Sequence, residues 1–174
     1  MHLSTLPLRV LVASAAVYCI SGASVLAQES TSAQQARVQG VVDELTARLG
    51  ISEPVHASIV PVNHLLMSVE PTEHVFELKV EDGWVDSLDD AEIRAGVAHE
   101  LGHVWIFTHH PFLQTEQLAN EVAMRIVSPA HLAQLYDKVW KRTNVKGDLA
   151  RFLGPEVARG LASPEGEAPA PQVP

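Results

Sequence analysis

The apolar positions of this chain recur at helical spacing in some segments and alternate in others. Across residues 30–50 they form one stripe with the 3.6-residue period of an amphipathic helix. Gly50 is a typical helix stop, and Pro54 follows it. We therefore expect a first helix over residues 30–50. Its apolar stripe consists of Val38, Val41, Val42, Leu45 and Leu49.

Three short segments that could form strands follow this helix. Residues 55–60 end at Pro61, and residues 64–69 end before Pro71, so both are typical of strands. Residues 73–80 alternate, which predicts a half-buried strand that turns at residues 82–83. The side chains on one face of this strand are His74, Phe76, Leu78 and Val80.

The second half of the chain reads as helical. Asp89 and Glu92 have the spacing of a capping box, which predicts a helix from Asp89 to about residue 108. Further helices are expected from Thr115 to about residue 127 and over residues 130–142. The core stripe of the first of these helices consists of Ile93, Val97, Leu101 and Val104. A helix, a few strands and then several helices indicate an α+β domain.

The segment HELGH, residues 99–103, lies inside the first of these later helices and is an HExxH motif. His99 and His103 lie one turn apart on one face, about 5–6 Å between Cβ atoms, so both imidazoles can reach one zinc ion. Glu100 can then act on a zinc-bound water as a general base. The motif predicts a zinc-dependent peptidase.

A catalytic zinc ion needs a third protein ligand, and four candidates follow the motif: His109, His110, Glu116 and Glu121. Glu121 shares a helix face with Arg125, four residues on, which is typical of a solvated ion pair. Glu116 and Asn120 instead share the opposite face with small apolar residues, where polar groups need a partner.

We therefore assign Glu116 as the third zinc ligand and Asn120 as a residue that orients a ligating histidine. His109 and His110 remain alternatives, and Glu116 as a simple first-turn acid favoured by the helix dipole is another. The glycines Gly96 and Gly102 would let the second helix approach the first closely.

The HExxH motif followed by Glu116 and Asn120 resembles the gluzincin pattern HExxH…ExxxD. With the upstream strand 75–80 and the stretch Ala95-Gly96-Val97-Ala98 before His99, the chain is similar to HtpX-like and CAAX-protease-like zinc peptidases in their soluble, minimal form, the minigluzincins. The segment around Asn120 also resembles ImmA/IrrE-type peptidases, which would leave the chemistry unchanged.

The resemblance implies a small zincin-like domain with an N-terminal helix, a short sheet, an HExxH helix and a ligand helix. It implies that His99, His103 and Glu116 bind zinc, that Glu100 is the general base, and that the strand 73–80 borders the cleft and pairs with an extended peptide. The chain departs from the pattern at Asn120, which stands where an aspartate is usual.

The 174-residue chain suits one domain with processing segments. Arg9, the apolar run 10–20 and the small residues before Gln28 predict an export signal over residues 1–27. Residues 28–160 would form the peptidase domain, and the Pro/Ala-rich residues 161–174 a disordered tail. Cys19 is the only cysteine, so the mature chain would have no disulfide.

We expect an exported, periplasmic or secreted metalloendopeptidase with one Zn²⁺ per chain and a peptide or protein substrate. The net charge of −9 disfavours nucleic acid as a partner, and no span is expected in the mature chain. The alternative is a zinc-binding protein without catalysis, acting as a binding or chaperone module. Donors to a tetrahedral oxyanion could be His64, His131 or Tyr136, although an ordinary structural role is expected for each.

Overall fold

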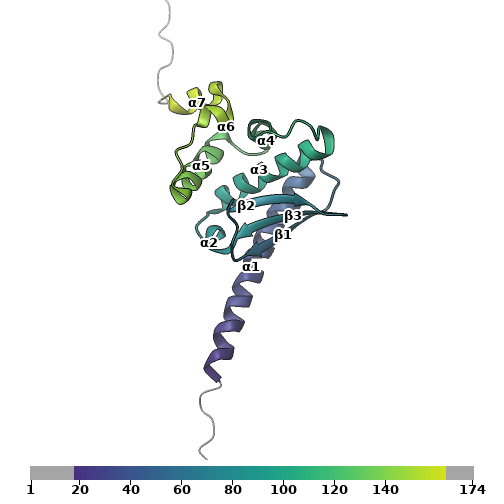
Figure 1. Cartoon of the computed structure of the whole chain (residues 1–174), viewed down its shortest axis with the longest axis vertical. Coiled ribbons are helices and arrows are strands. Elements are labelled where there is room, and N and C mark those ends of the chain that lie inside the picture. The colour runs from purple at the N-terminus through teal and green to yellow at the C-terminus, as the bar shows by residue number, and fades with distance from the viewer. Residues whose placement is uncertain (1–17, 164–174) are drawn as a thin grey trace, which may run out of the picture.

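The computed structural model describes the backbone of residues 18–163 and the side chains of residues 30–163. The elements follow in this order: α1 (Tyr18–Leu49), β1 (Val55–Val60), β2 (Met67–Pro71), β3 (Phe76–Glu81), α2 (Asp82–Val85), α3 (Asp90–His109), α4 (Glu116–Ala123), α5 (Pro129–Thr143), α6 (Leu149–Leu153) and α7 (Pro155–Ala162). This is the expected α+β fold (Figure 1).

The three strands form one mixed sheet in the order β1-β3-β2. β1 runs parallel to β3, with Val55 opposite Phe76, and β2 runs antiparallel to β3, with Met67 opposite Val80. β3 is therefore the central strand. β2 has a free edge, and this edge faces the helices that follow in the chain.

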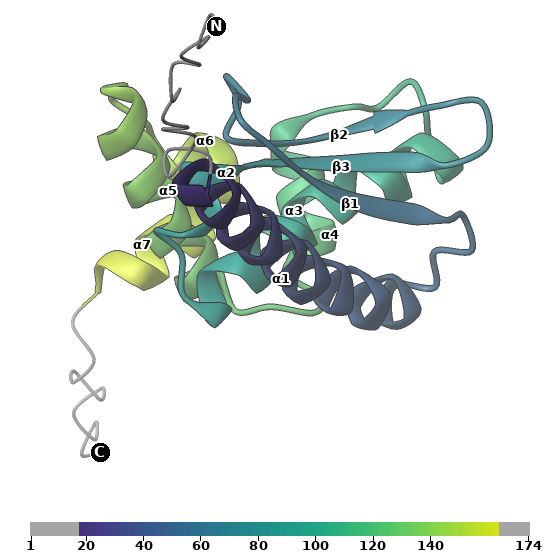
Figure 2. The same cartoon turned by 90° about the horizontal axis from the view of Figure 1, so that it is seen from below.

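Alternation along β3 determines which face of the sheet is covered. Phe76, Leu78 and Val80 are buried, as expected, while His74 precedes the strand and is exposed. The buried side chains pack against α1, which contacts β1, and α3, which contacts β2. Figure 2 shows α1 crossing the sheet and α3. The sheet thus provides a support on which α3 is held rigidly.

α3 forms as the capping box predicts. The Asp89 side chain accepts from the Glu92 N–H at 2.8 Å, and the Glu92 carboxylate accepts from the Asp89 N–H at 2.9 Å. The four residues of the expected core stripe, Ile93, Val97, Leu101 and Val104, have no exposed surface. Burial of this stripe orients the neighbouring face, which carries the histidines of the motif, away from the core.

Several boundaries differ from the sequence expectation. α1 begins at Tyr18 rather than at residue 30. β2 begins three residues later than expected, because Asn63 accepts a hydrogen bond from the Leu65 N–H and Leu66 adopts a left-handed conformation with φ 66°. β2 also includes Pro71 as its last residue, whereas the strand was expected to end before this proline. An edge strand can contain a proline, because one side of the strand forms no ladder hydrogen bonds.

Short helices account for the remaining differences. The expected turn at residues 82–83 is the helix α2, which buries Trp84. α4 ends at Ala123, earlier than expected, and Ser128 caps α5 by accepting from the His131 N–H. α6 and α7 were not expected from the sequence at all. Both lie beside α5, as Figure 1 shows.

The export signal and the disordered tail fall mostly on residues that the structure does not describe. Residues 1–17 and 164–174 lie outside it, and the described start of α1 covers the end of the predicted signal. No helix in the described part of the chain combines the length and apolarity that crossing a bilayer requires.

Candidate metal centre

α3 presents the two histidines of the motif side by side. The His99 and His103 rings lie 4.9 Å apart between centroids in an edge-to-face arrangement. Their side chains are 14% and 22% exposed, so they are accessible but held by neighbours. Glu100 lies between them on the helix and is buried. The helical period therefore places two imidazoles and one carboxylate at a single surface.

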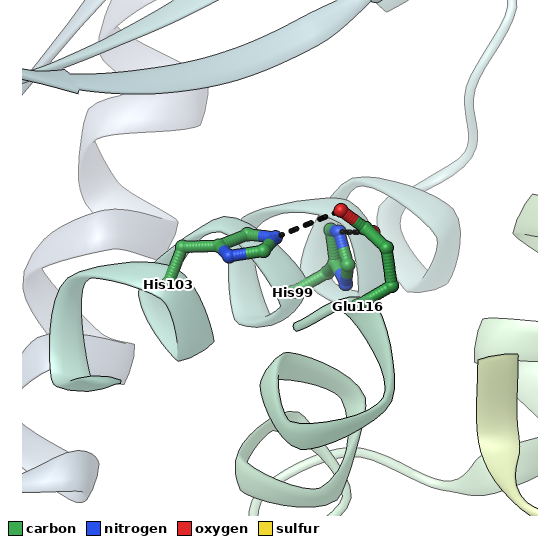
Figure 3. Close-up of side chains that lie close together, drawn as sticks. All are labelled: His99, His103 and Glu116. Atoms are coloured by element: carbon green, nitrogen blue, oxygen red, sulfur yellow. Dashed lines mark ion pairs between the residues drawn. The ribbon is translucent and has the colours of Figure 1, made fainter. Parts of the chain in front are cut away.

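α4 brings Glu116 to the same place. Thr115 caps the helix by accepting a hydrogen bond from the Leu118 N–H at 3.1 Å, which makes Glu116 the first helical residue. Glu116 Oε2 lies 3.3 Å from His99 Nε2, and Oε1 lies 3.6 Å from His103 Nε2. Figure 3 shows both rings pointing toward this carboxylate.

The separation of these atoms suits zinc. Ligands at about 2.0–2.1 Å in a tetrahedral arrangement are about 3.3–3.4 Å from one another. The two measured separations are 3.3 and 3.6 Å, and all three donor atoms lie within 4.8 Å of one another. His99, His103 and Glu116 could therefore hold a metal ion through two nitrogens and one oxygen, leaving a fourth position open.

Gly102 allows this close approach of α3 and α4. A Cβ atom built on Gly102 would lie 2.3 Å from the carbonyl oxygen of Ala119, closer than any packing permits. The prediction for Gly102 is thus confirmed. The same prediction for Gly96 is wrong: a Cβ there would meet the side chains of Met67 and Leu135, from β2 and α5.

Asn120 lies behind His99, away from Glu116, and has no exposed surface. Its Nδ2 donates to the Phe152 carbonyl at 3.0 Å and to the Tyr136 hydroxyl at 2.7 Å. Since a carbonyl only accepts, these bonds fix the orientation of the amide. Oδ1 therefore faces His99 Nδ1 at 2.9 Å and accepts a hydrogen bond from its N–H, which leaves the Nε2 lone pair free for a metal.

Gln114 performs the same task for His103, which the sequence did not suggest. Its Nε2 donates to the His103 carbonyl at 3.2 Å, and its Oε1 lies 3.2 Å from His103 Nδ1. The residue belongs to the loop before α4, where no periodicity indicates a direction. Its position two residues before the assigned ligand is the one signal that the sequence offers.

Burial raises the pKa of Glu100, although the charges of His99 and His103 oppose the shift. A hydrogen bond with the backbone of Val69, in β2, also lowers the pKa and holds the carboxylate toward that strand. The sequence gave no sign of this contact, because it depends on how the sheet packs against α3. A buried carboxylate with a raised pKa is suited to accepting a proton.

Glu116 has the opposite shift. Hydrogen bonds with His103 and then His99 depress its pKa well below the usual range for a carboxylic acid, despite partial burial. Burial alone would lower the pKa of His103, but its hydrogen bonds with Glu116 and Gln114 and the nearby carboxylate charges outweigh burial, so its pKa is raised. The carboxylate of Glu116 is thus favoured in its anionic form.

The alternative third ligands lie elsewhere. The His109 ring stacks on Trp105 at 4.3 Å between centroids, and its Nδ1 lies 2.9 Å from the Trp105 carbonyl oxygen. His110 caps the end of α3 and is exposed. Glu121 is exposed and accepts a hydrogen bond from Gln117. Of the residues described, only His99, His103 and Glu116 form a group of this kind.

The three residues open into a cleft of about 770 Å³. α3 forms its floor, the strand β2 one wall, and α5 with Phe152 the other wall. Most of the lining side chains are apolar. His64 and Tyr136 line the cleft, whereas His131 is exposed and lies outside its lining.

One expectation from the family resemblance is corrected here. The strand 73–80 was expected to border the cleft and pair with a peptide. Phe76 of β3 does line the cleft, but β3 has no free edge for a peptide, because β1 lies on one side of it and β2 on the other. The backbone of Val69 reaches Glu100, so the free edge of β2 faces the cleft. β2 is therefore the strand with unpaired backbone groups at this site.

Comparison with solved structures found two chains of similar fold. The structure is similar to the metallopeptidase zymogen abylysin of Pyrococcus abyssi, with a TM-score of 0.48 and 15% identity over 64% of this chain and 99% of that one. It is also similar to the metallopeptidase zymogen jannalysin of Methanocaldococcus jannaschii, with a TM-score of 0.47 and 17% identity over 60% and 95%. No family model matches the chain, and no curated protein matches it.

Proposed function

We propose that this protein is a zinc-dependent metalloendopeptidase. The observation that carries the proposal is the convergence of His99, His103 and Glu116 at zinc-ligand separations, beside the buried carboxylate of Glu100 and within a cleft. Three protein ligands with one open position are typical of catalytic zinc, whereas structural zinc usually has four.

The nitrogen and oxygen donors fit zinc chemically, because the hydrogen bonds at Nδ1 of His99 and His103 leave each Nε2 lone pair available to a metal, and Glu116 offers a carboxylate oxygen. When bound there, Zn²⁺ would lower the pKa of water and polarise the scissile carbonyl. Asn120 and Gln114 hold the two rings in place, so that the donor atoms need not reorganise on binding.

Glu100 is the proposed general base and acid. Its carboxylate accepts a proton from the attacking water and later delivers it to the leaving amine. Burial and the Val69 contact hold it at one position beside the ligands. A carboxylate in this position is needed for hydrolysis but not for holding a metal, which separates catalysis from simple zinc binding.

The substrate is proposed to be an extended peptide lying along β2. An edge strand offers unpaired backbone N–H and C=O groups that a peptide can pair with, as in strand addition. Met67, Ser68 and Val69 line the cleft from this strand, next to Glu100. Pairing there would place a peptide backbone across the three assigned ligands.

Glu100→Gln is the decisive variant, because it keeps the shape of the side chain and removes its basicity. We expect zinc binding unchanged and cleavage of a mixture of unstructured peptides reduced by at least about 100-fold. The matched control is Glu121→Gln, on the exposed face of α4. Equal cleavage by both variants would contradict the mechanism, and zinc binding without any cleavage by the wild type would favour a non-catalytic module.

We also propose that the protein is exported to the periplasm or secreted, with residues 1–27 as the signal. The proposal rests on the sequence of the N-terminus: Arg9, the apolar run and the small residues before Gln28. N-terminal sequencing of the chain recovered outside the cytoplasm checks it, with Gln28 as the expected first residue.

A further inference from the structure

Positive charge gathers in the last helices of the chain. Residues 129–163 contain six of the chain's 12 lysine and arginine residues and three acids, so this segment has a net charge of +3 in a chain of net charge −9. Three of these cations form ion pairs with acids of the chain: Lys138, Arg142 and Arg159. Among the residues that the structure describes, Lys141 and Lys146 are exposed and join no ion pair.

Lys141 and Lys146 line a second, more open cavity of about 550 Å³, formed by α5 and the loop after it. We call it the Lys141–Lys146 cavity. Asp137 is the one acid in its lining, and Trp140 and Val145 are its large apolar side chains. Two cations and one acid give this cavity a net positive charge, although the molecule as a whole is acidic.

The loop after α5 is held against the helix. Asn144 adopts a left-handed conformation with φ 54°, and its N–H and that of Val145 both donate to the Trp140 carbonyl. A Cβ atom built on Gly147 would lie 1.7 Å from Trp140 Cε2, so the backbone passes directly over the indole ring and only glycine fits there. The position of Lys146 beside α5 is therefore set by its neighbours in the loop.

The Lys141–Lys146 cavity continues the cleft that holds the candidate metal centre. Trp140 and Val145 line both hollows. The Arg142 guanidinium donates to the Glu81 carboxylate at 2.6 Å, and the Glu81 N–H donates to the Leu66 carbonyl at 2.9 Å. The end of α5 therefore lies where β2 begins, and a peptide that follows β2 would leave the cleft toward the two lysines.

The length of α5 gives the distance from the candidate metal centre to this cavity. The Tyr136 ring lies 6.0 Å from the His99 ring between centroids, and Thr143 is the last residue of the helix. From Tyr136 to Thr143 the helix rises about 10 Å, at 1.5 Å per residue. An extended peptide covers this length in about three residues. The cavity is therefore reached by the third to about the fifth substrate residue from the scissile bond.

We propose that the Lys141–Lys146 cavity binds an acidic side chain of the substrate, three to about five residues from the scissile bond on one side of it. The inference rests on the proposed peptidase function and names its substrate class. Opposite charge gives selectivity for the carboxylate, and Trp140 and Val145 contact its aliphatic stem. The net charge of −9 repels an acidic peptide at long range, so a preference for one has to arise locally.

The test compares peptides that differ only in having Glu or Gln at the third to fifth positions on either side of the mapped cleavage site. The wild type should favour Glu in kcat/KM by at least about threefold, on one side only. Because both lysines are exposed, added salt should reduce this preference. Lys141→Gln/Lys146→Gln should remove it, and Lys141→Glu/Lys146→Glu should reverse it in favour of Lys peptides.

Arg151→Gln/Arg159→Gln is the matched control, because it removes two exposed cations of the same segment that do not line the cavity. It should keep the preference of the wild type. Equal rates of the wild type on Glu and Gln peptides would overturn the inference, as would a preference that survives in Lys141→Gln/Lys146→Gln or is lost equally in the control. Lysine-dependent binding of phosphatidylserine vesicles with equal peptide rates would also overturn it and indicate a lipid surface.

A separate readout distinguishes failure of this inference from failure of the peptidase proposal. Fluorescein-labelled Glu and Gln peptides are bound to the zinc-loaded Glu100→Gln protein, and anisotropy is expected to show at least about threefold tighter binding of the Glu peptide. Selective binding without any cleavage by the wild type would contradict the peptidase proposal and keep the acid-binding cavity. Cleavage by the wild type with equal binding of both peptides would keep the peptidase proposal and overturn the cavity.

Discussion

At the residue scale, the geometry of the candidate metal site depends on two side-chain amides. Asn120 fixes the orientation of the His99 ring, and Gln114 fixes that of the His103 ring. Asn120 stands where the pattern that the sequence resembles usually has an aspartate. The groups that surround Asn120 explain why an amide suits this position. The Phe152 carbonyl needs a donor, which an amide supplies and a carboxylate does not. The same amide keeps an acceptor for His99. The departure from the pattern therefore preserves the task of orienting the ring.

Asn120→Ala removes three hydrogen bonds at a fully buried position. We expect zinc affinity to fall about 10–100-fold, since His99 loses its orienting partner. The free energy of unfolding should fall by about 1–3 kcal/mol, because the Phe152 carbonyl is left without its donor. Competition with a chromophoric chelator measures the first effect, and denaturant unfolding the second.

Gln117→Ala serves as the control for this variant. Gln117 is on the same helix, is exposed, and bonds only to Glu121 among the described contacts. It should leave zinc affinity unchanged. Zinc affinity of Asn120→Ala equal to that of the control would show that the amide does not position His99.

Helical period indicates the direction of a side chain where the segment is a helix. It separates Glu116 and Asn120 from Glu121, and the structure places the first two beside His99. Gln114 and the Val69 backbone could not be found this way. Gln114 lies in a loop, and the Val69 contact crosses from a strand to a helix 31 positions away in the chain.

At the element scale, α3 and α4 together carry the three residues that could hold a metal ion. The long helix α3 was predictable because a capping box, a four-residue core stripe and a motif all agree on it. The short helices α2 and α6 were not, because four or five residues carry no periodicity. Which strand faces the cleft also could not be read from the sequence, because strand order follows from tertiary packing.

Gly102→Ala tests the contact between these two helices. A Cβ atom 2.3 Å from the Ala119 carbonyl oxygen cannot be accommodated unless the backbone of α4 moves. We expect a loss of about 1–3 kcal/mol in the free energy of unfolding, although alanine favours the helix itself. Zinc affinity should also fall, since Glu116 moves with α4. Thermal unfolding with and without zinc measures both.

Gly40→Ala provides the comparison, because the same substitution in open space on α1 should raise the free energy of unfolding by up to about 1 kcal/mol. If Gly102→Ala were as stable as Gly40→Ala and bound zinc as tightly, the close packing of α3 and α4 described here would be wrong.

At the scale of the whole molecule, the chain is a small α+β domain in which a sheet supports one long helix and the later helices complete a cleft over it. Three residues from two helices meet at one point of that cleft. The fold class and these residues follow from sequence pattern and motif. The depth of the cleft does not, since its walls come from distant segments, β2, α5 and Phe152 of α6, that meet only through packing.

Zinc content of the purified, untagged chain tests the central claim most directly, measured beside Glu116→Ala and the exposed control Glu121→Ala. The wild type and Glu121→Ala should each hold one zinc per chain. Glu116→Ala should bind zinc more weakly by more than the roughly 10–100-fold effect of losing an orienting partner. A wild type that binds no zinc, or a Glu116→Ala variant that binds it as tightly as the wild type, would contradict the account.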